Sequence, residues 1–292
     1  MTVHPAPLRP AVPAIRADIV GREAGPRRET IDARWLMAYA AGAGARHPCF
    51  FDTTASDGPL AHPLFAVCYE WPLMVDIRAE AIGTAAAPFG VHASHHLVVH
   101  RLPRAGDQLS TRARVTAVSP RRSGTLVVVR LVTADQRGET VSETDYGSFF
   151  RGVALEGADA AVASSRRPGP EAGAVRWSEP IAVPSQSAHI YTECARIWNP
   201  IHTDLAAARA AGLPGPILHG TATLALAVSR LIDRDLASEA ALVRGIAGRF
   251  TGMVPLPSTM VVRARERRAD GLAFDVVTAA GLPLISEGVL HL

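Results

Sequence analysis

Lysine is absent from this chain, and all 30 basic side chains among its 292 residues are arginines. This absence excludes chemistry that needs a reactive amine, such as Schiff-base formation, a pyridoxal-phosphate lysine or the lysine of a P-loop. Aromatic residues are scarce at 5%, and the arginines form scattered doublets with no long run. A nucleic-acid-binding surface usually combines a basic stripe with aromatic side chains that stack on bases, so we do not expect nucleic acid as a partner.

Cysteine is also rare. Cys49, Cys68 and Cys194 are odd in number and form no Cys-x-x-Cys pair, which favours a reducing compartment and predicts a cytoplasmic protein. The N-terminal segment lacks the apolar core of a signal peptide. The longest apolar stretch, ILHGTATLALAVSRLI, is shorter than a membrane span and contains His219 and Arg230, so we expect no membrane association.

The local motifs of several enzyme classes are missing. No G-x-S-x-G serine motif occurs, and GAGAR at residues 42–46 lacks the third glycine of a dinucleotide-binding turn. Four histidines cluster in GVHASHHLVVHRL, but a strand there would place His95 and His96 on opposite faces. No thiolate or carboxylate is near them in the sequence, and we therefore predict no metal site and no resident cofactor.

Apolar residues make up 48% of the chain, which is enough for a sizeable core. Residues 156–174, EGADAAVASSRRPGPEAGA, are small, charged and interrupted by proline and glycine, a composition typical of a linker. The sequence thus predicts a first domain at residues 1–155, a linker at 156–174 and a second domain at 175–292.

The two halves repeat each other weakly but in the same order. YAAGAGARHPCFFD, from Tyr39 to Asp52, aligns with YTECARIWNPIHTD, from Tyr191 to Asp204, so that tyrosine, proline and aspartate coincide. Further along, AHPLFAV corresponds to LHGTATLALAV, and LSTRAR corresponds to MVVRAR. Each match is short, but their common order indicates two copies of one fold.

Each half shows the same succession of expected elements. A short helical segment leads into a proline-containing loop, and apolar segments and runs rich in valine, leucine and threonine follow. Residues 221–232 are apolar nearly all round, as expected for a helix enclosed by a sheet. RADG and TAAGLP are turn signals that predict antiparallel hairpins. The predicted fold class is α+β, a double hot-dog in which each antiparallel sheet wraps around one apolar helix.

The second half resembles the MaoC-like dehydratases and R-specific enoyl-CoA hydratases. Their signature is a tyrosine, then Ser-Gly-Asp-x-Asn-Pro-Ile-His, an aspartate two residues on and a His-Gly pair downstream. This chain matches it at Tyr191, Asn199, Pro200, Ile201, His202, Asp204, His219 and Gly220. The first half resembles the degenerate N-terminal repeat of double hot-dog members, with Phe50 at the position of His202. The resemblance implies a hydratase or dehydratase that acts on 2-enoyl or 3-hydroxyacyl thioesters of coenzyme A or a carrier protein, with a homodimer left open.

The resemblance also suggests the roles of individual residues. The family uses an aspartate and a histidine as its catalytic pair; His202 has the histidine position, whereas Ile197 replaces the aspartate. His202 is therefore the predicted proton-transfer residue, and Asn199 accompanies it in the catalytic loop, where it orders the loop or binds substrate. The N–H of Gly220, at a helix start, is the predicted donor to an enolate oxygen, and Thr221 and Ile197 are expected to contact substrate.

Three further residues are secondary candidates. Asp204 precedes the helical pattern LAAARAAG and is suited to cap it, whereas Glu193 lies one helical turn before Ile197 and could replace the missing carboxylate. His219 is expected to order the turn before the apolar helix. Because Ile197 cannot transfer a proton, two alternatives stay open: a hot-dog acyl-CoA thioesterase and a catalytically silent acyl-thioester-binding protein.

Overall fold

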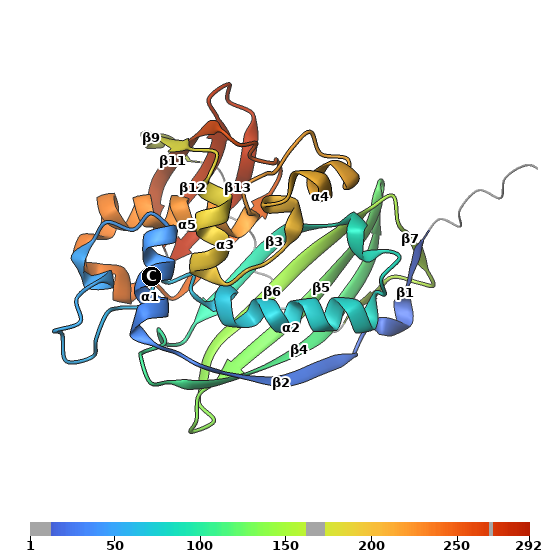
Figure 1. Cartoon of the computed structure of the whole chain (residues 1–292), viewed down its shortest axis with the longest axis horizontal. Coiled ribbons are helices and arrows are strands. Elements are labelled where there is room, and N and C mark those ends of the chain that lie inside the picture. The colour runs from blue at the N-terminus through green and yellow to red at the C-terminus, as the bar shows by residue number, and fades with distance from the viewer. Residues whose placement is uncertain (1–12, 162–172, 269–270) are drawn as a thin grey trace, which may run out of the picture.

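The computed structural model describes residues 13–161, 173–268 and 271–292 (Figure 1). The first half contains β1 (Ala14–Arg16), η1 (Ala17–Ile19), β2 (Glu23–Thr30), α1 (Ala33–Gly42), η2 (Pro48–Phe50), α2 (Ala66–Ala81), η3 (Ala87–Phe89), β3 (Gly90–Val99), β4 (Gln108–Arg121), β5 (Gly124–Ala134), β6 (Thr140–Arg151), β7 (Ala154–Glu156) and β8 (Ala160–Ala161). The second half contains β9 (Val175–Val183), α3 (Ser187–Ala195), η4 (Pro200–His202), α4 (Leu205–Ala210), α5 (Gly220–Leu231), the π-helical turn η5 (Ile232–Leu236), η6 (Ala237–Leu242), β10 (Gly245–Phe250), β11 (Ser258–Arg268), β12 (Gly271–Thr278) and β13 (Pro283–His291). Both halves thus share the order strand, helix, proline turn, long helix and four strands, to which each half adds short elements of its own.

One 11-stranded sheet passes through both halves in the order β2-β4-β5-β6-β3-β10-β13-β12-β11-β9, with β8 paired to β4 beside this path. The halves are joined where β3 and β10 pair in antiparallel fashion, with His95 opposite Gly248. β1 and β7 form a separate two-stranded parallel pair. The expectation of an antiparallel sheet in each half is therefore confirmed, and the two sheets join side by side.

A long helix packs against each half of the sheet, α2 in the first half and α5 in the second (Figure 1). α5 begins at Gly220, where the His-Gly pair predicted a helix start, and nearly all of its residues are buried. This burial explains why the segment is apolar all round, because no face of the helix meets water. α2 contains Pro72 without losing its helical course.

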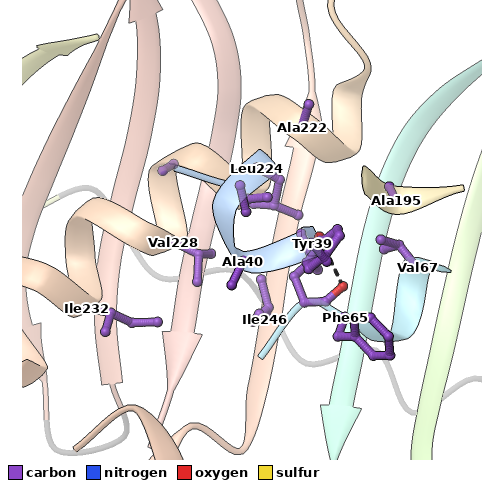
Figure 2. Packing of buried hydrophobic residues seen from close by; sticks show 14 of the residues in the cluster. Tyr39, Ala40, Phe65, Val67, Ala195, Ala222, Leu224, Val228, Ile232 and Ile246 are labelled. Atoms are coloured by element: carbon purple, nitrogen blue, oxygen red, sulfur yellow. Dashed lines mark hydrogen bonds between the residues drawn. The ribbon is translucent and has the colours of Figure 1, made fainter. Parts of the chain in front are cut away.

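The repeat seen in the sequence appears in space as a pair of helices. α1 and α3 pack against each other, and the hydroxyl oxygens of Tyr39 and Tyr191, which occupy equivalent positions in the two repeats, lie 3.5 Å apart. Both tyrosines are fully buried. Figure 2 shows Tyr39 and Ala40 of α1 beside Leu224 and Val228 of α5, so one hydrophobic core extends across the two halves.

The predicted linker is ordered at its start. Glu156 ends β7, and residues 160–161 form β8 against β4, so the first residues of the 156–174 segment belong to the sheet region of the first half. Residues 162–172 lie outside the described residues. The division into domains at 1–155 and 175–292 therefore stays a prediction.

Candidate active site

A cavity of about 250 Å³ is lined by residues of both halves. Most of the predicted site residues meet there: Ile197, Asn199, His202, His219, Gly220 and Thr221 all line it. The second half also contributes residues 250–254, at and just after the end of β10, and the first half contributes residues of α2, β3 and β6. Glu193 is exposed on α3 and is not among the lining residues, so the structure does not bring this carboxylate to His202.

The loop that holds His202 owes its shape to local interactions. Pro200 is at the first position of η4, where its fixed φ suits a helical turn and its missing N–H is not needed. Asp204 caps α4, because its carboxylate accepts a hydrogen bond from the N–H of Ala207 at 2.9 Å. The capping role expected of Asp204 is thereby confirmed, and its side chain does not line the cavity.

His202 is placed as a proton acceptor. Its Nδ1 lies 2.9 Å from the carbonyl oxygen of Ile217, and because a carbonyl only accepts hydrogen bonds, Nδ1 carries the proton and Nε2 keeps a free lone pair. Burial lowers the pKa of His202 to about 4, so the imidazole is neutral near pH 7. A neutral ring with one nitrogen anchored to the backbone is the state required of a general base.

His219 supports His202 from one side. The two rings are stacked, with centroids 3.7 Å apart and planes inclined by 27°. Nε2 of His219 is hydrogen-bonded to the hydroxyl of Thr192 at 3.2 Å, which ties the ring to α3. Burial and the neighbouring His202 lower the pKa of His219, so both rings are neutral near pH 7.

Gly220 opens α5 with its N–H in the first helical turn, where backbone donors lack acceptors within the helix. The phenyl ring of Phe250 packs so closely that a Cβ at residue 220 would meet its atoms at 3.2 Å. Any larger residue would push this ring or narrow the cavity. The glycine therefore leaves a helix N-terminus, with its partial positive charge, open to a substrate oxygen.

Ile197 lies in the cavity wall with 3% of its surface exposed and belongs to the main hydrophobic core. The residue before it, Arg196, ends α3 in the left-handed conformation at φ 56°, which an arginine adopts less readily than the glycine of the family signature. Its guanidinium lies 4.0 Å from the ring centre of Trp35 and 3.6 Å from a carboxylate oxygen of Asp32. Arg196 thus points to α1 and is engaged there, away from the cavity side of residue 197.

Sequence reasoning missed the polar wall that the first half contributes. Glu70 of α2, His92 and His95 of β3 and Tyr146 of β6 all line the cavity. His95 is buried, and next to a bulge between His92 and Ser94 the centre of the His92 ring lies 5.4 Å from that of the His95 ring. The histidine cluster was a signal, but only the β3–β10 pairing connects it to the loop of His202.

Within the described ranges, no three histidine, cysteine, aspartate or glutamate side chains gather as metal ligands would. The same part of the chain has no helix that is both long and apolar enough to cross a membrane.

Comparison with known families agrees with this geometry. Residues 170–285 match the MaoC like domain, and residues 18–144 match the FAS1-like, dehydratase domain region. The second half of the chain belongs to the MaoC-like domain family. His202, Asn199 and Gly220 all fall inside the part that matches this MaoC-like domain.

The fold of the whole chain is shared with solved structures. A MaoC-like dehydratase from Phytophthora capsici superposes with a TM-score of 0.82 at 20% identity, covering 94% of this chain and 97% of that one. A Mycobacterium tuberculosis protein described as a double hot-dog superposes with a TM-score of 0.59 at 20% identity, covering 93% and 94%. The double hot-dog fold is therefore confirmed. In sequence, the chain is 24% identical over 220 residues to a probable enoyl-CoA hydratase 2 of Dictyostelium discoideum, 74% of each chain.

Proposed function

We propose that this protein hydrates trans-2-enoyl thioesters, or dehydrates the corresponding 3-hydroxyacyl thioesters, with His202 as its proton-transfer residue. The observation that carries the proposal is the hydrogen bond from Nδ1 of His202 to the carbonyl of Ile217, which leaves Nε2 available at a cavity that also contains the N-terminus of α5. The likeness to an enoyl-CoA hydratase 2 supports the same reaction class.

In the hydration direction, the thioester carbonyl oxygen accepts a hydrogen bond from the N–H of Gly220. Nε2 of His202 removes a proton from water as the water oxygen forms its bond to C3, and the electron pair of the C2–C3 double bond moves onto the carbonyl oxygen. The enolate is stabilised at the N-terminus of α5. The protonated His202 then returns its proton to C2, which re-forms the carbonyl and completes the addition of water.

One imidazole performs both proton transfers in this scheme, because Ile197 has no proton to give and Glu193 is remote from the cavity. The loss of an acid–base partner usually lowers a rate by about 10²–10⁴-fold, so we expect slow turnover compared with enzymes that keep the aspartate. No resident cofactor takes part; coenzyme A, or a carrier protein, enters as part of the substrate. A cytoplasmic location and a homodimer remain proposals.

The size of the cavity favours a short or medium acyl group, since about 250 Å³ falls below the roughly 300–1,000 Å³ of sites for drug-sized ligands. A thioesterase is the second candidate, and Glu70 is the observation that favours it, because it brings a carboxyl group into the same cavity. Burial raises the pKa of Glu70 to about 8, so this carboxyl is mostly protonated at pH 7 and a poor base for attack on a thioester, and we favour the hydratase.

The deciding experiment is incubation with trans-2-butenoyl-, trans-2-hexenoyl- and trans-2-octenoyl-CoA while enoyl absorbance and free thiol are followed together. Loss of enoyl absorbance without release of thiol supports the hydratase. Release of thiol identifies a thioesterase. Tight binding with neither change identifies a silent binding protein and overturns the proposal.

A further inference from the structure

The first half gives the cavity a polar wall that the hydration scheme does not use. Val67, Glu70, Trp71, Met74 and Arg78 line the cavity from α2, a spacing of three and four residues that defines a single face of the helix. Within this otherwise largely apolar face, Glu70 is 2% exposed, far more buried than acidic side chains usually are.

The carboxyl group of Glu70 is held from the sheet. The hydroxyl of Thr144 on β6 donates to Oε1 of Glu70 at 2.8 Å, and the described part of the chain provides no further hydrogen-bond partner for this carboxyl group. Burial raises the pKa of Glu70 to about 8, so the group is mostly a neutral acid at pH 7. As an acid, it has one O–H to donate and one oxygen that can still accept.

His95 lies on the same patch of sheet. It is directly opposite Tyr146 on β6, and Thr144 is two residues from Tyr146, so all three side chains share one face. His95 is 1% exposed, and neither of its ring nitrogens has a hydrogen-bond partner among the described residues. Buried polar atoms without a partner are rare in native proteins and require an explanation such as a bound group.

A row of rings connects this patch with the reaction end of the cavity. Phe250 packs against Gly220, its ring lies 4.4 Å from that of His92, and the ring of His92 stacks on Tyr146 at 3.7 Å. An acyl chain whose carbonyl oxygen is at Gly220 would therefore pass these rings before it reached His95 and Glu70.

We propose that Glu70 and His95 form a subsite for a hydroxyl group carried by the acyl part of the substrate, several carbons from the thioester. The proposal rests on the acyl-thioester function proposed above and specifies its substrate class. A hydroxyl donates one hydrogen bond and accepts others, which matches an imidazole nitrogen on one side and a carboxylic acid on the other.

The charge state of the patch favours a hydroxyl over a carboxylate. Burial lowers the pKa of His95 to about 3, so its ring is neutral beside the neutral acid of Glu70. A carboxylate there would lose its hydration beside two neutral groups, and the guanidinium of Arg78, which also lines the cavity, already donates to the carbonyl of Ala87 and lies over the ring of Phe150.

The test measures binding of saturated thioesters by calorimetry, which needs no turnover: hexanoyl-CoA, 5-hydroxyhexanoyl-CoA, 6-hydroxyhexanoyl-CoA and adipoyl-CoA. We expect one of the hydroxylated thioesters to bind about 10-fold or more tightly than hexanoyl-CoA. Equal binding of the hydroxylated and plain chains overturns the subsite. Tightest binding of adipoyl-CoA overturns the assignment to a hydroxyl group.

Three variants show which residues cause the preference. Glu70→Leu and His95→Leu should each remove most of the 10-fold difference, whereas Glu70→Gln, which keeps a donor and an acceptor, should retain it. Met74→Leu is the matched control on the same helix face and should change the affinity for both chains by the same factor. A preference that survives both leucine variants, with their melting temperatures near that of the wild type, overturns the assignment.

The subsite and the reaction fail in different ways. If the wild type binds the hydroxylated chain more tightly but hydrates no enoyl thioester, the subsite stands and the hydratase proposal falls. If it hydrates hexenoyl-CoA and 6-hydroxyhexenoyl-CoA with equal kcat/KM, and binds their saturated analogues equally, the hydratase stands and the subsite falls.

Discussion

The proline-containing turns of the two halves, η2 and η4, are both short 3₁₀ helices, but they differ in one side chain that decides their chemistry. Phe50 in η2 has the position that His202 has in η4. In each half a histidine that precedes the long helix lies beside this residue: His62 before α2, and His219 before α5. The ring of Phe50 is 5.7 Å from that of His62, and the ring of His202 is 3.7 Å from that of His219. Neither Phe50 nor His62 lines the cavity, whereas both of their counterparts do.

The hydrogen bonds of His62 show what a structural histidine looks like in this fold. The N–H of Leu64 donates to Nδ1 of His62, Nε2 of His62 donates to the hydroxyl of Ser229, and that hydroxyl donates to the carbonyl of Ala43. Both ring nitrogens of His62 are hydrogen-bonded, so this residue links the two halves and has no nitrogen available for proton transfer to a substrate. His202, in contrast, has one nitrogen anchored and one available at a cavity. The comparison shows that a histidine in this fold can transfer a proton only if one of its ring nitrogens is available at the cavity.

The largest effect is expected from His202→Phe, which gives the second half the side chain of the first. Turnover of a short enoyl thioester should fall by about 10²–10⁴-fold, because the proton acceptor is lost. The measurement is the initial rate of enoyl absorbance loss, with His202→Ala in parallel and the melting temperature as a check on folding. Phe50→Leu is the matched control in the first half and should leave this rate within about 2-fold of wild type. Unchanged turnover in either His202 variant would make it a structural residue like His62.

Ile197→Asp tests whether the second half still has the geometry for a full catalytic pair. A carboxylate beside His202 should raise the hydration rate by roughly 10-fold or more, with the 10²–10⁴-fold of a full acid–base contribution as the upper bound. It should also lower the melting temperature, because residue 197 is buried in the core and Arg196 is engaged with Asp32 and Trp35. Ile197→Asn is the control, since it is polar but transfers no proton. Equal rates for the two variants would mean that the cavity wall no longer places residue 197 where a carboxylate can transfer a proton.

Acidification should destabilise the folded protein through both histidines, His202 and His62. Burial lowers the pKa of His202 to about 4 and that of His62 to about 3, from 6.5, so the folded state holds both rings neutral. Below pH 6.5 the unfolded chain binds protons at these two rings that the folded chain does not bind. The free energy of unfolding is therefore highest above pH 6.5 and decreases as the pH falls towards 4. Melting temperatures at pH 7, 6 and 5 should therefore decrease in that order.

His62→Gln should reduce that decrease without moving the acid limb of kcat/KM, which His202 should set near pH 4. An acid limb near pH 6.5 would contradict the buried environment described for His202. An acid limb that moves in His62→Gln would contradict the structural role of His62.

The smallest effect concerns the residue with a left-handed backbone that follows each short helix. The first half has Gly44 at φ 67° where the second half has Arg196 at φ 56°. Arg196→Gly relieves about 1 kcal/mol of backbone strain and removes a cation–π contact and an exposed ion pair of similar total size. The free energy of unfolding in urea should therefore change by less than about 1 kcal/mol. Arg196→Ala loses the contacts and keeps the strain, so it should be the less stable of the two variants; the reverse order would show that the left-handed conformation of residue 196 costs little.

Much of the reaction end of the site was predictable because its determinants are local. Pro200 fixes the turn, Asp204 caps the next helix, and Gly220 starts α5, each through residues within a few positions along the chain. The repeat in the sequence likewise identified Tyr39 and Tyr191 as equivalent residues, and the order of the expected elements predicted the hot-dog fold. Glu193 shows the limit of such reasoning, since a spacing of one helical turn did not bring its side chain to the cavity.

The sequence by itself thus determined the fold, the turn that carries His202 and the loss of the family aspartate at Ile197. Only the tertiary structure decided which residues of the first half form the other wall of the cavity. Glu70, His95 and Tyr146 are separated from His202 by between 50 and 135 residues, and they reach its cavity because β3 pairs with β10 and α2 packs on the same sheet. The physical reason is that turns and caps depend on neighbours in the chain, whereas a cavity wall depends on which sheet edges join.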